Sequence, residues 1–152
     1  MAETKADFTF QARWADMDFN GHMKNTAYLD YASDSRMLYF KENGFPLSEF
    51  SKLGIGPIVF KDTIQYFREI FMYETFVVTL RMKGFSQNGS KFHLVNDIRK
   101  IDGAKVAVVT SEACWFDLKK RQITTPPEAL FTLLKNLEKT EDYSEIPPNG
   151  NR

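Results

Sequence analysis

The second half of the chain alternates apolar and polar side chains with a period of two, the pattern of strands that cover one face of a sheet. The alternation is clearest in residues 76–83 and 92–98. Asn88-Gly89 and Asp102-Gly103 separate the apolar runs and are turn dipeptides that accept a positive φ. The pattern therefore predicts an antiparallel meander with strands near 57–67, 75–86, 91–101 and 105–118.

The first half combines one strand with one long helix. Residues 8–14 begin with alternating aromatic and polar side chains and predict a first strand. From Met23 to about Asn43 the chain has neither Gly nor Pro, and one helical face is polar apart from a single methionine. This predicts a long helix that is buried except for a narrow stripe. The exposed stripe consists of Thr26, Asp30, Ser33, Asp34, Met37 and Lys41.

Two further helical signals and a polar tail complete the expected organisation. Residues 48–53 predict a short helical turn. Thr125-Pro-Pro-Glu128 supplies an N-cap, two prolines for the first turn and a capping-box glutamate, and so predicts a helix from about Pro126 to Lys139. Residues 140–152 are polar, which predicts a disordered tail behind a single domain of residues 1–139.

These elements predict an α+β fold. One long helix has to cover a sheet of several antiparallel strands, so the sheet is expected to wrap around that helix. Unpaired strand edges invite another chain. A symmetric homodimer that forms edge to edge is therefore expected, and a homotetramer stays open as a larger assembly.

Charge and length exclude several classes of function. The 152 residues correspond to one domain, and 20 basic residues balance 20 acidic ones, so we expect neither a nucleic-acid partner nor a membrane partner. The longest uncharged run, Leu53–Phe60, is far shorter than the roughly 20 apolar residues of a membrane helix. Residues 1–7 lack the apolar core of a signal peptide, which predicts a cytoplasmic location.

Several kinds of catalytic chemistry lack their signatures here. Cys114, His22 and His93 are the only soft ligands, too few for a structural zinc site, and we expect no metal and no cofactor. The chain has no Gly-x-Ser-x-Gly elbow and no Gly-x-x-x-x-Gly-Lys loop. Gly54-Ile-Gly56 lacks the third glycine of a dinucleotide-binding motif. Serine-hydrolase, nucleoside-triphosphate and nicotinamide chemistry are thereby disfavoured.

Polar groups concentrate in residues 16–25, where the first strand leads into the long helix. The first N–H groups of a helix lack intrahelical acceptors and can hold a developing anion, such as the oxyanion of a reacting carbonyl. Gly21 allows the backbone to approach a ligand closely there, and Asp18 can present a carboxylate to the other side of the carbonyl carbon. A base or nucleophile beside an oxyanion hole is the minimum machinery for acyl transfer or hydrolysis.

Residues 13–29 also form a family motif, RWADMDFNGHMKNTAYL. The stretch resembles the Asp-x-Asp-x-x-Gly-His-x-x-Asn-x-x-Tyr signature of the hot-dog-fold acyl-CoA thioesterases, the 4-hydroxybenzoyl-CoA thioesterase family, and the likeness in element order extends over residues 8–138. In that family the sheet wraps the long helix and active sites lie between subunits. The resemblance implies that Asp18 is the essential carboxylate and that the backbone N–H groups near Gly21 and His22 polarise the thioester carbonyl.

The other polar residues of the motif leave alternatives open. Asp16 is expected to order the loop, with Arg13 as its partner. His22 resembles the acyl-carrier-protein thioesterase branch, where such a side chain is implicated directly, but it could also contact solvent or a neighbouring subunit. Cys114 is expected to be a small buried hydrophobic residue, and His93 to be uninvolved.

Two motif positions and one basic run concern substrate binding. Asn25 resembles the same branch and is expected to orient Asp18, to bind the thioester, or to cap the loop backbone. Gly21 and Tyr28 are the candidate substrate-binding residues, although the helical spacing of Tyr28 favours the core. Lys119-Lys120-Arg121 could bind the phosphates of coenzyme A or form solvated surface.

The sequence as a whole favours a thioesterase that hydrolyses acyl-CoA or acyl-carrier-protein thioesters to a free acid and a thiol. Asp18 would act either as a general base or as a nucleophile, and the sequence does not decide between these roles. A non-catalytic module that binds acyl thioesters is the alternative. A related dehydratase is a third hypothesis, although such enzymes pair Asp and His at another spacing.

Overall fold

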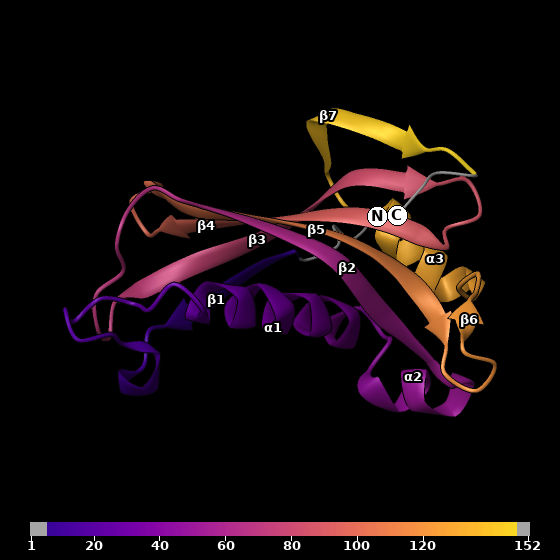
Figure 1. The fold of residues 1–152 in the computed structure, drawn as a ribbon, viewed down its shortest axis with the longest axis horizontal. Coiled ribbons are helices and arrows are strands. Elements are labelled where there is room, and N and C mark those ends of the chain that lie inside the picture. Colours follow the sequence, from indigo (N-terminus) through magenta and orange to yellow (C-terminus); the bar gives the residue numbers. More distant parts are fainter. Residues whose placement is uncertain (1–5, 149–152) are drawn as a thin grey trace.

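The computed structural model describes residues 6–148 and forms a curved sheet with helices on its concave side (Figure 1). The helices are the 3-10 helix η1 (Trp14–Asp16), α1 (Ala27–Glu42), α2 (Leu47–Leu53) and α3 (Glu128–Lys135). The strands are β1 (Asp7–Gln11), β2 (Ile55–Tyr66), β3 (Thr75–Ser86), β4 (Lys91–Lys100), β5 (Lys105–Asp117), β6 (Gln122–Ile123) and β7 (Lys139–Ile146). The predicted α+β architecture, a sheet curved around one long helix, is present.

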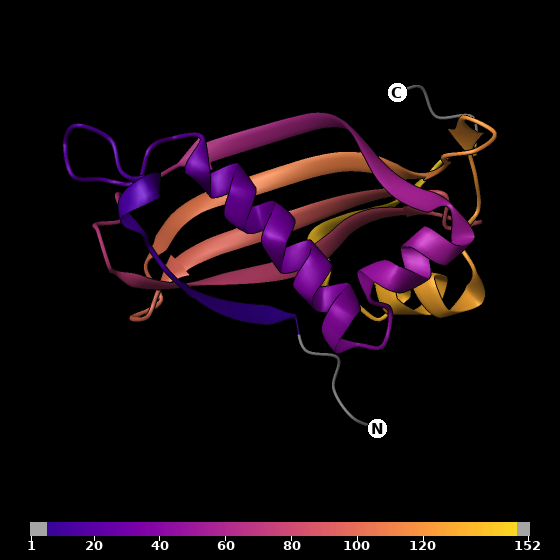
Figure 2. The same cartoon turned by 90° about the horizontal axis from the view of Figure 1, so that it is seen from below.

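The strands of the sheet lie in the order β1-β3-β4-β5-β2, and neighbours along this path are antiparallel. Helix α1 crosses the concave face diagonally (Figure 2). The predicted meander holds for β3, β4 and β5, but it is wrong for β2, which pairs with β5 instead of β3. Consequently β1 and β2 lie at opposite ends of the strand order, and one side of β2 is an open edge.

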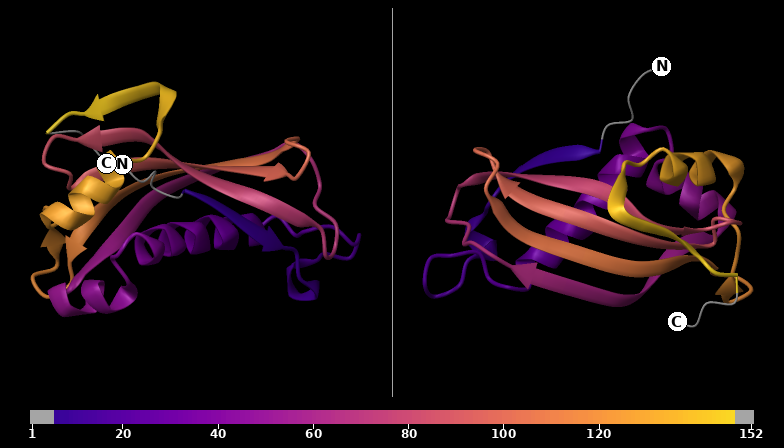
Figure 3. Two further views of the ribbon diagram at one scale, coloured as in Figure 1. Left: turned by 180° about the vertical axis from the view of Figure 1, so that it is seen from behind. Right: turned by 90° about the horizontal axis from the view of Figure 1, so that it is seen from above.

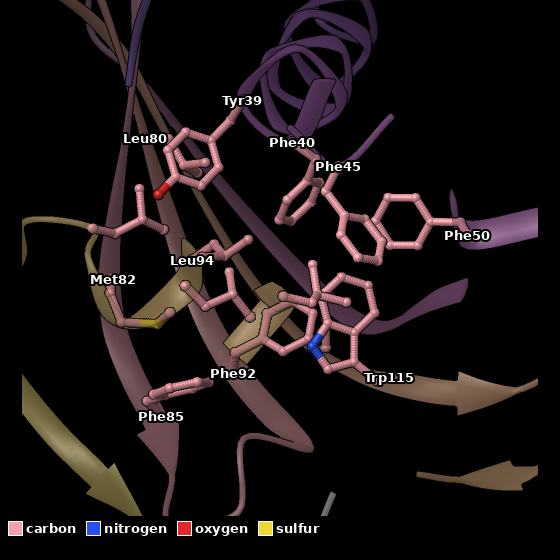
Figure 4. Close-up of a cluster of buried hydrophobic side chains, with 14 of the residues drawn as sticks. Tyr39, Phe40, Phe45, Phe50, Leu80, Met82, Phe85, Phe92, Leu94 and Trp115 are labelled. Atoms are coloured by element: carbon pink, nitrogen blue, oxygen red, sulfur yellow. The ribbon is translucent and has the colours of Figure 1, made fainter. Parts of the chain in front are cut away.

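The core consists of two clusters between α1 and the sheet. One cluster is rich in aromatic residues: Phe40 from α1 packs against Phe50 from α2 and Trp115 from β5 (Figure 4). The other surrounds the first half of α1. Cys114 is buried, as expected. Burial of apolar area contributes roughly 25 cal/mol per Å², so these clusters fix α1 against the sheet.

The exposed face of α1 matches the stripe predicted from the sequence, with Met37 partly buried and the other five residues exposed. The predicted start at Met23 is wrong, because the helix begins at Ala27. Met23 instead donates its backbone N–H to the carbonyl of Ile70, 2.8 Å away, and is held in an extended segment. The N–H of Ala27 donates to the carbonyl of Lys24 in a turn that precedes the helix.

A polar cluster interrupts the apolar contact between the middle of α1 and the sheet. The Arg36 guanidinium donates from Nε to Asn96 Oδ1 (3.1 Å) and from Nη2 to Ser111 Oγ (2.6 Å). Ser111 Oγ in turn donates to Asp62 on β2, at 2.5 Å. Burial lowers the pKa of Arg36 below its ordinary value, while the charge of Asp62 opposes that shift. The cluster links the centre of the helix to the open edge of the sheet.

The end of the chain departs most from the sequence-based expectation. The last helix, α3, ends at Lys135 instead of Lys139. The expected disordered tail is corrected, because residues 139–146 form β7. The reason is that β1 pairs with β3 only as far as Thr79, and β7 runs parallel to the rest of β3, from Met82 to Ser86 (Figure 3). Residues 149–152 of the expected tail lie outside the described residues.

No helix within residues 6–148 is long and apolar enough to cross a membrane.

Candidate active site

The loop between η1 and α1 is a tight turn closed by its own backbone. Met17 and Met23 form an antiparallel bridge, and the N–H of Asp18 donates to the carbonyl of His22 at 2.8 Å. The Gly21 N–H donates back to the carbonyl of Asp18 at 3.2 Å. Gly21 has φ +77°, which a residue with a Cβ adopts only with strain. The glycine of the motif is therefore required by the shape of this turn.

The turn fixes one oxygen of the Asp18 carboxylate and leaves the other accessible. Oδ1 accepts hydrogen bonds from the N–H of Asn20 (2.8 Å) and of His22 (3.2 Å). Among the described residues, Oδ2 accepts no hydrogen bond, and the side chain is exposed. An oriented carboxylate with one free oxygen can accept a proton from water or attack a carbonyl carbon.

Asp16 anchors the loop from the inside. Its carboxylate is buried and accepts hydrogen bonds from the Arg13 side chain and from the Tyr31 hydroxyl. Burial opposes ionisation of Asp16, but the bonds from Arg13 and Tyr31 outweigh it and lower the pKa of the carboxyl group below its ordinary value. The expected contact between Asp16 and Arg13 is present.

His22 lies against the connection between β2 and β3. Its Nε2 is 3.7 Å from Oε2 of Glu69, and its ring meets the ring of Phe71 edge to face at 5.0 Å between centroids. The backbones of His22 and Phe71 also form an antiparallel bridge. These contacts hold the imidazole in place, with 28% of its side chain exposed.

Asn25 and Tyr28 connect the motif to the end of β2. The side chain of Asn25 is exposed, and its backbone carbonyl accepts a hydrogen bond from the Tyr66 hydroxyl at 2.8 Å. Tyr28 is 3% exposed and packs edge to face against Tyr66 in the core around α1. Burial raises the pKa of the Tyr28 phenol above its ordinary value. Tyr28 is thus a core residue of this chain, as its helical spacing favoured.

The backbone donors implied by the family motif are engaged within the loop. The N–H of Gly21 bonds the Asp18 carbonyl, and the N–H of His22 bonds the Asp18 carboxylate. Neither belongs to the first turn of the helix, because α1 begins only at Ala27. The N–H groups that carry the positive end of the helix dipole are therefore those at the start of α1.

The connection between β2 and β3 was not predicted from the sequence to contribute to this site. It brings Tyr66, Glu69 and Phe71 to the motif residues. Phe67, Phe71 and Tyr73 are about half exposed or more. A run of aromatic residues between two strands, where polar turn residues are usual, was the available signal.

Asp18 and Asn25 are exposed in the single chain, and His22 is partly exposed. The three cavities near Ser90, Met37 and Phe131 are lined by other residues and lie away from Asp18, His22 and Asn25. The basic run 119–121 follows β5, at the opposite end of the molecule from the Asp18 loop (Figures 1 and 2). There, the N–H groups of Lys120 and Lys119 bond the Asp117 carboxylate and lower its pKa.

No metal centre is formed by the described part of the chain: its His, Cys, Asp and Glu side chains do not gather in a group of three that could hold an ion. His93 lies on β4, with its Nε2 3.5 Å from Glu112 Oε1, and burial lowers its pKa.

A family model described as "Thioesterase-like superfamily" matches residues 12–134. Among solved structures, a Staphylococcus aureus protein in complex with CoA is 20% identical with a TM-score of 0.80, over 92% of this chain and 90% of that chain. A 1,4-dihydroxy-2-naphthoyl-CoA thioesterase from Synechocystis is 14% identical with a TM-score of 0.77, over 86% and 95%. A gentisyl-coenzyme A thioesterase is 17% identical with a TM-score of 0.74, over 84% and 98%. No curated protein gives a significant match.

Proposed function

Because the chain belongs to the thioesterase-like superfamily and has its α+β hot-dog fold, we propose that it hydrolyses acyl-CoA or acyl-carrier-protein thioesters to a free acid and a thiol. The observation that carries this proposal is the Asp18 carboxylate, held through Oδ1 by two backbone N–H groups and open at Oδ2. Two of the solved structures with this fold are described as CoA thioesterases, which supports the substrate class.

Two routes use the same carboxylate. As a general base, Asp18 takes a proton from water while the resulting hydroxide attacks the thioester carbonyl, and the collapsing intermediate expels the thiolate, which then takes up a proton. As a nucleophile, Asp18 Oδ2 attacks the carbonyl carbon and expels the thiolate, which leaves a mixed anhydride that water cleaves. Each route yields one acid and one thiol.

The oxyanion needs hydrogen-bond donors that are free when substrate binds. The Ala27 N–H already donates to the Lys24 carbonyl, so the first turn of α1 offers the N–H groups that follow Ala27, and the exposed Asn25 side chain stands just before that turn. The N–H groups of Gly21 and His22 would first have to release Asp18. We therefore propose that the N–H groups at the start of α1 and the Asn25 amide donate hydrogen bonds to the oxyanion. His22 would help to hold the Asp18 carboxylate through its backbone N–H.

The site is proposed to be completed by a second copy of the chain. Strand β2 has one open edge, and Ile58, Val59 and Phe60 on it are more than a third exposed. Antiparallel pairing of two such edges would satisfy the free backbone groups and cover these side chains. The polar cluster of Arg36, Ser111 and Asp62 reaches the same edge.

A cytoplasmic location remains a prediction from the sequence.

Free-thiol release from a panel of acyl-CoA esters tests the proposal. The panel should span short, long and aromatic acyl groups, and each ester should also be titrated for binding by calorimetry. We expect hydrolysis of at least one ester at a rate well above the spontaneous rate. Saturable binding without thiol release across the panel would instead identify a non-catalytic acyl-thioester-binding module.

Single-turnover hydrolysis in H₂¹⁸O separates the two routes for Asp18. Label that enters the Asp18 carboxylate would establish the anhydride, because water cleaving the anhydride at the enzyme's carboxyl carbon leaves one labelled oxygen there. Label found only in the released acid would exclude attack of water at the Asp18 carboxyl carbon, and it is the result expected of the general base.

A further inference from the structure

Exposed aromatic side chains gather at the end of the molecule that carries the Asp18 loop. Within residues 6–148, seven aromatic side chains are more than a third exposed, and one of them, Phe60, lies in the middle of β2. The other six come from η1, the Asp18 loop, the last residue of β2 and the connection to β3, which lie together at one end (Figures 1 and 2). We call this surface the aromatic end, and its rings are those of Trp14, Phe19, Tyr66, Phe67, Phe71 and Tyr73.

Contacts between these segments hold the exposed rings in place. The backbones of Phe71 and His22 form a bridge, and the Phe67 N–H donates to a carbonyl of β5 at 2.8 Å. The Tyr73 N–H donates to the Ala12 carbonyl at 3.0 Å. Tyr73 has φ +65°, a conformation that costs free energy in a residue with a bulky side chain, yet this side chain is 62% exposed. Backbone strain of this kind is typical of binding and switch regions.

Lysine side chains flank two of these rings. Lys100 Nζ lies 5.4 Å from the ring centroid of Phe71, and Lys105 Nζ lies 4.9 Å from that of Phe67. A lysine can cover apolar surface with its stem while its ammonium group stays in polar surroundings. Trp and Tyr are enriched where proteins meet the headgroup region of a bilayer, and interfacial segments combine Trp, Phe or Leu with Lys or Arg. The aromatic end has the composition of a surface that lies at a lipid interface.

The charge of this end favours a bilayer over an acidic partner protein. Residues 13–24, 66–74 and 100–105 together contain five basic and five acidic side chains. Opposite charges also lie close together here, since Glu74 Oε2 is 3.1 Å from Lys100 Nζ. An acidic protein is recognised by an excess of positive charge, which these segments lack. Insertion of rings among headgroups depends instead on apolar area, which they supply.

We propose that the aromatic end binds the surface of a lipid bilayer, with its rings among the headgroups. Phe19 is fully exposed and adjoins Asp18, so binding places the candidate site at the surface where long acyl chains partition. Backbone pairing along β2 does not involve the five rings that lie outside that strand. Binding to lipid does not depend on thioesterase activity.

The expectation of no membrane partner rested on net charge and on the length of uncharged runs in the sequence. Neither quantity describes the aromatic end, because its residues come from separate segments that only the fold brings together.

Tryptophan fluorescence tests the proposal on the unmodified chain. The chain has two tryptophans: Trp115 is fully buried in the core, and Trp14 is 73% exposed on the aromatic end. Phosphatidylcholine vesicles should therefore shift the emission of Trp14 to shorter wavelength, and lipids brominated close to the headgroup should quench it. Vesicles that also contain phosphatidylglycerol measure the contribution of anionic headgroups. Because the charge of this end is balanced, binding to phosphatidylcholine should persist at high salt.

Vesicle co-sedimentation of variants locates the contact. Phe19→Ser and Trp14→Ser each remove one exposed ring, and we expect each to weaken partitioning onto phosphatidylcholine vesicles by about tenfold or more. Leu47→Ser and Leu118→Ser are the matched controls, because both side chains are exposed and apolar but lie near the opposite end of the molecule (Figure 1). The controls should bind as the wild type does. Thiol release from a short-chain ester in solution reports on the proposed function separately.

The outcomes separate a lipid surface from the other occupants. An emission shift, quenching and co-sedimentation that both aromatic variants lose and both controls keep would support the proposal. It is overturned if the wild-type chain binds neither kind of vesicle, if the four variants bind alike, or if binding requires phosphatidylglycerol and disappears in salt. A change of assembly state in Phe19→Ser, seen by analytical ultracentrifugation, would identify a contact with a second copy instead. Binding of an acidic acyl carrier protein through Phe19, by a chain that ignores vesicles, would identify a protein partner and equally overturn the proposal.

Discussion

Replacing Tyr31 by Phe removes one hydroxyl from a buried carboxylate and leaves the ring contacts in place. The Tyr31 hydroxyl donates to Asp16 Oδ2, and the ring packs edge to face against Phe10 and Phe76. A hydrogen bond to a charged group contributes about 1.5–3 kcal/mol. Only 4% of the Asp16 side chain is exposed, so water cannot replace the lost donor, and we expect the free energy of unfolding to fall by about 2 kcal/mol at pH 7.

The pH dependence of this stabilisation follows from the direction in which folding shifts the pKa of Asp16. Because the pKa of Asp16 is lowered in the folded chain, its stabilising effect is present above the unfolded value of about 3.9 and is lost as the pH falls through the folded value. Burial, followed by the hydrogen bond to Asp16, raises the pKa of Tyr31 to about 12, so the hydroxyl stays a donor at neutral pH. The difference between wild type and variant should therefore narrow in acid.

Urea unfolding at pH 7 and near pH 3 measures both effects, with Tyr73→Phe as the control because the side chain of Tyr73 is exposed. A loss under about 0.5 kcal/mol at pH 7, no more than ordinary surface substitutions cause, would refute the reasoning. So would a loss that is equal at the two pH values.

Four other substitutions test the site and the fold. Gly21→Ala places a Cβ at φ +77° and should destabilise the chain by about 1–2 kcal/mol by urea unfolding, with reduced thiol release because the Asp18 turn shifts. Ser111→Ala leaves Arg36 without one of its acceptors and should lower the unfolding free energy by about 1–3 kcal/mol; an unchanged value would show that water replaces the hydroxyl. Gly89→Ala should destabilise more than Gly103→Ala, because the added Cβ would lie 2.4 Å from the Phe131 ring at the first position and in open space at the second. Equal melting temperatures for the two glycine variants would contradict the packing of α3.

The pattern of apolar and polar residues along the chain predicted the individual strands and the long helix, because these depend mainly on residues close in sequence. The period of two marked β3, β4 and β5 close to their observed bounds, and the polar stripe marked the exposed face of α1. The pairing of β2 with β5 could not be predicted in this way, because strand order depends on contacts between distant segments. Strand β7 was missed because its side chains are mostly polar and Ile146 is its one buried residue.

The candidate site likewise has features that the sequence predicted and features that it did not. The motif located the turn around Gly21 and the anchoring of Asp16 by Arg13, since both depend on residues close in sequence. The contacts of His22 with Glu69 and Phe71 join segments almost 50 residues apart, which no spacing within the motif reveals. The start of α1 was placed too early because Met23 to Thr26 have no helix breaker, although backbone pairing with Ile70 holds Met23 extended.

Thiol release by Asp18→Asn tests the central claim most directly. The asparagine keeps an Oδ1 that can accept the two backbone N–H groups of the turn, while its amide cannot act as a base or a nucleophile. With Asp30→Asn as the control, we expect kcat to fall by about 100-fold or more, with an unchanged melting temperature and assembly state. A variant that turns over within a few-fold of the wild-type rate would contradict the assignment of the reaction to Asp18.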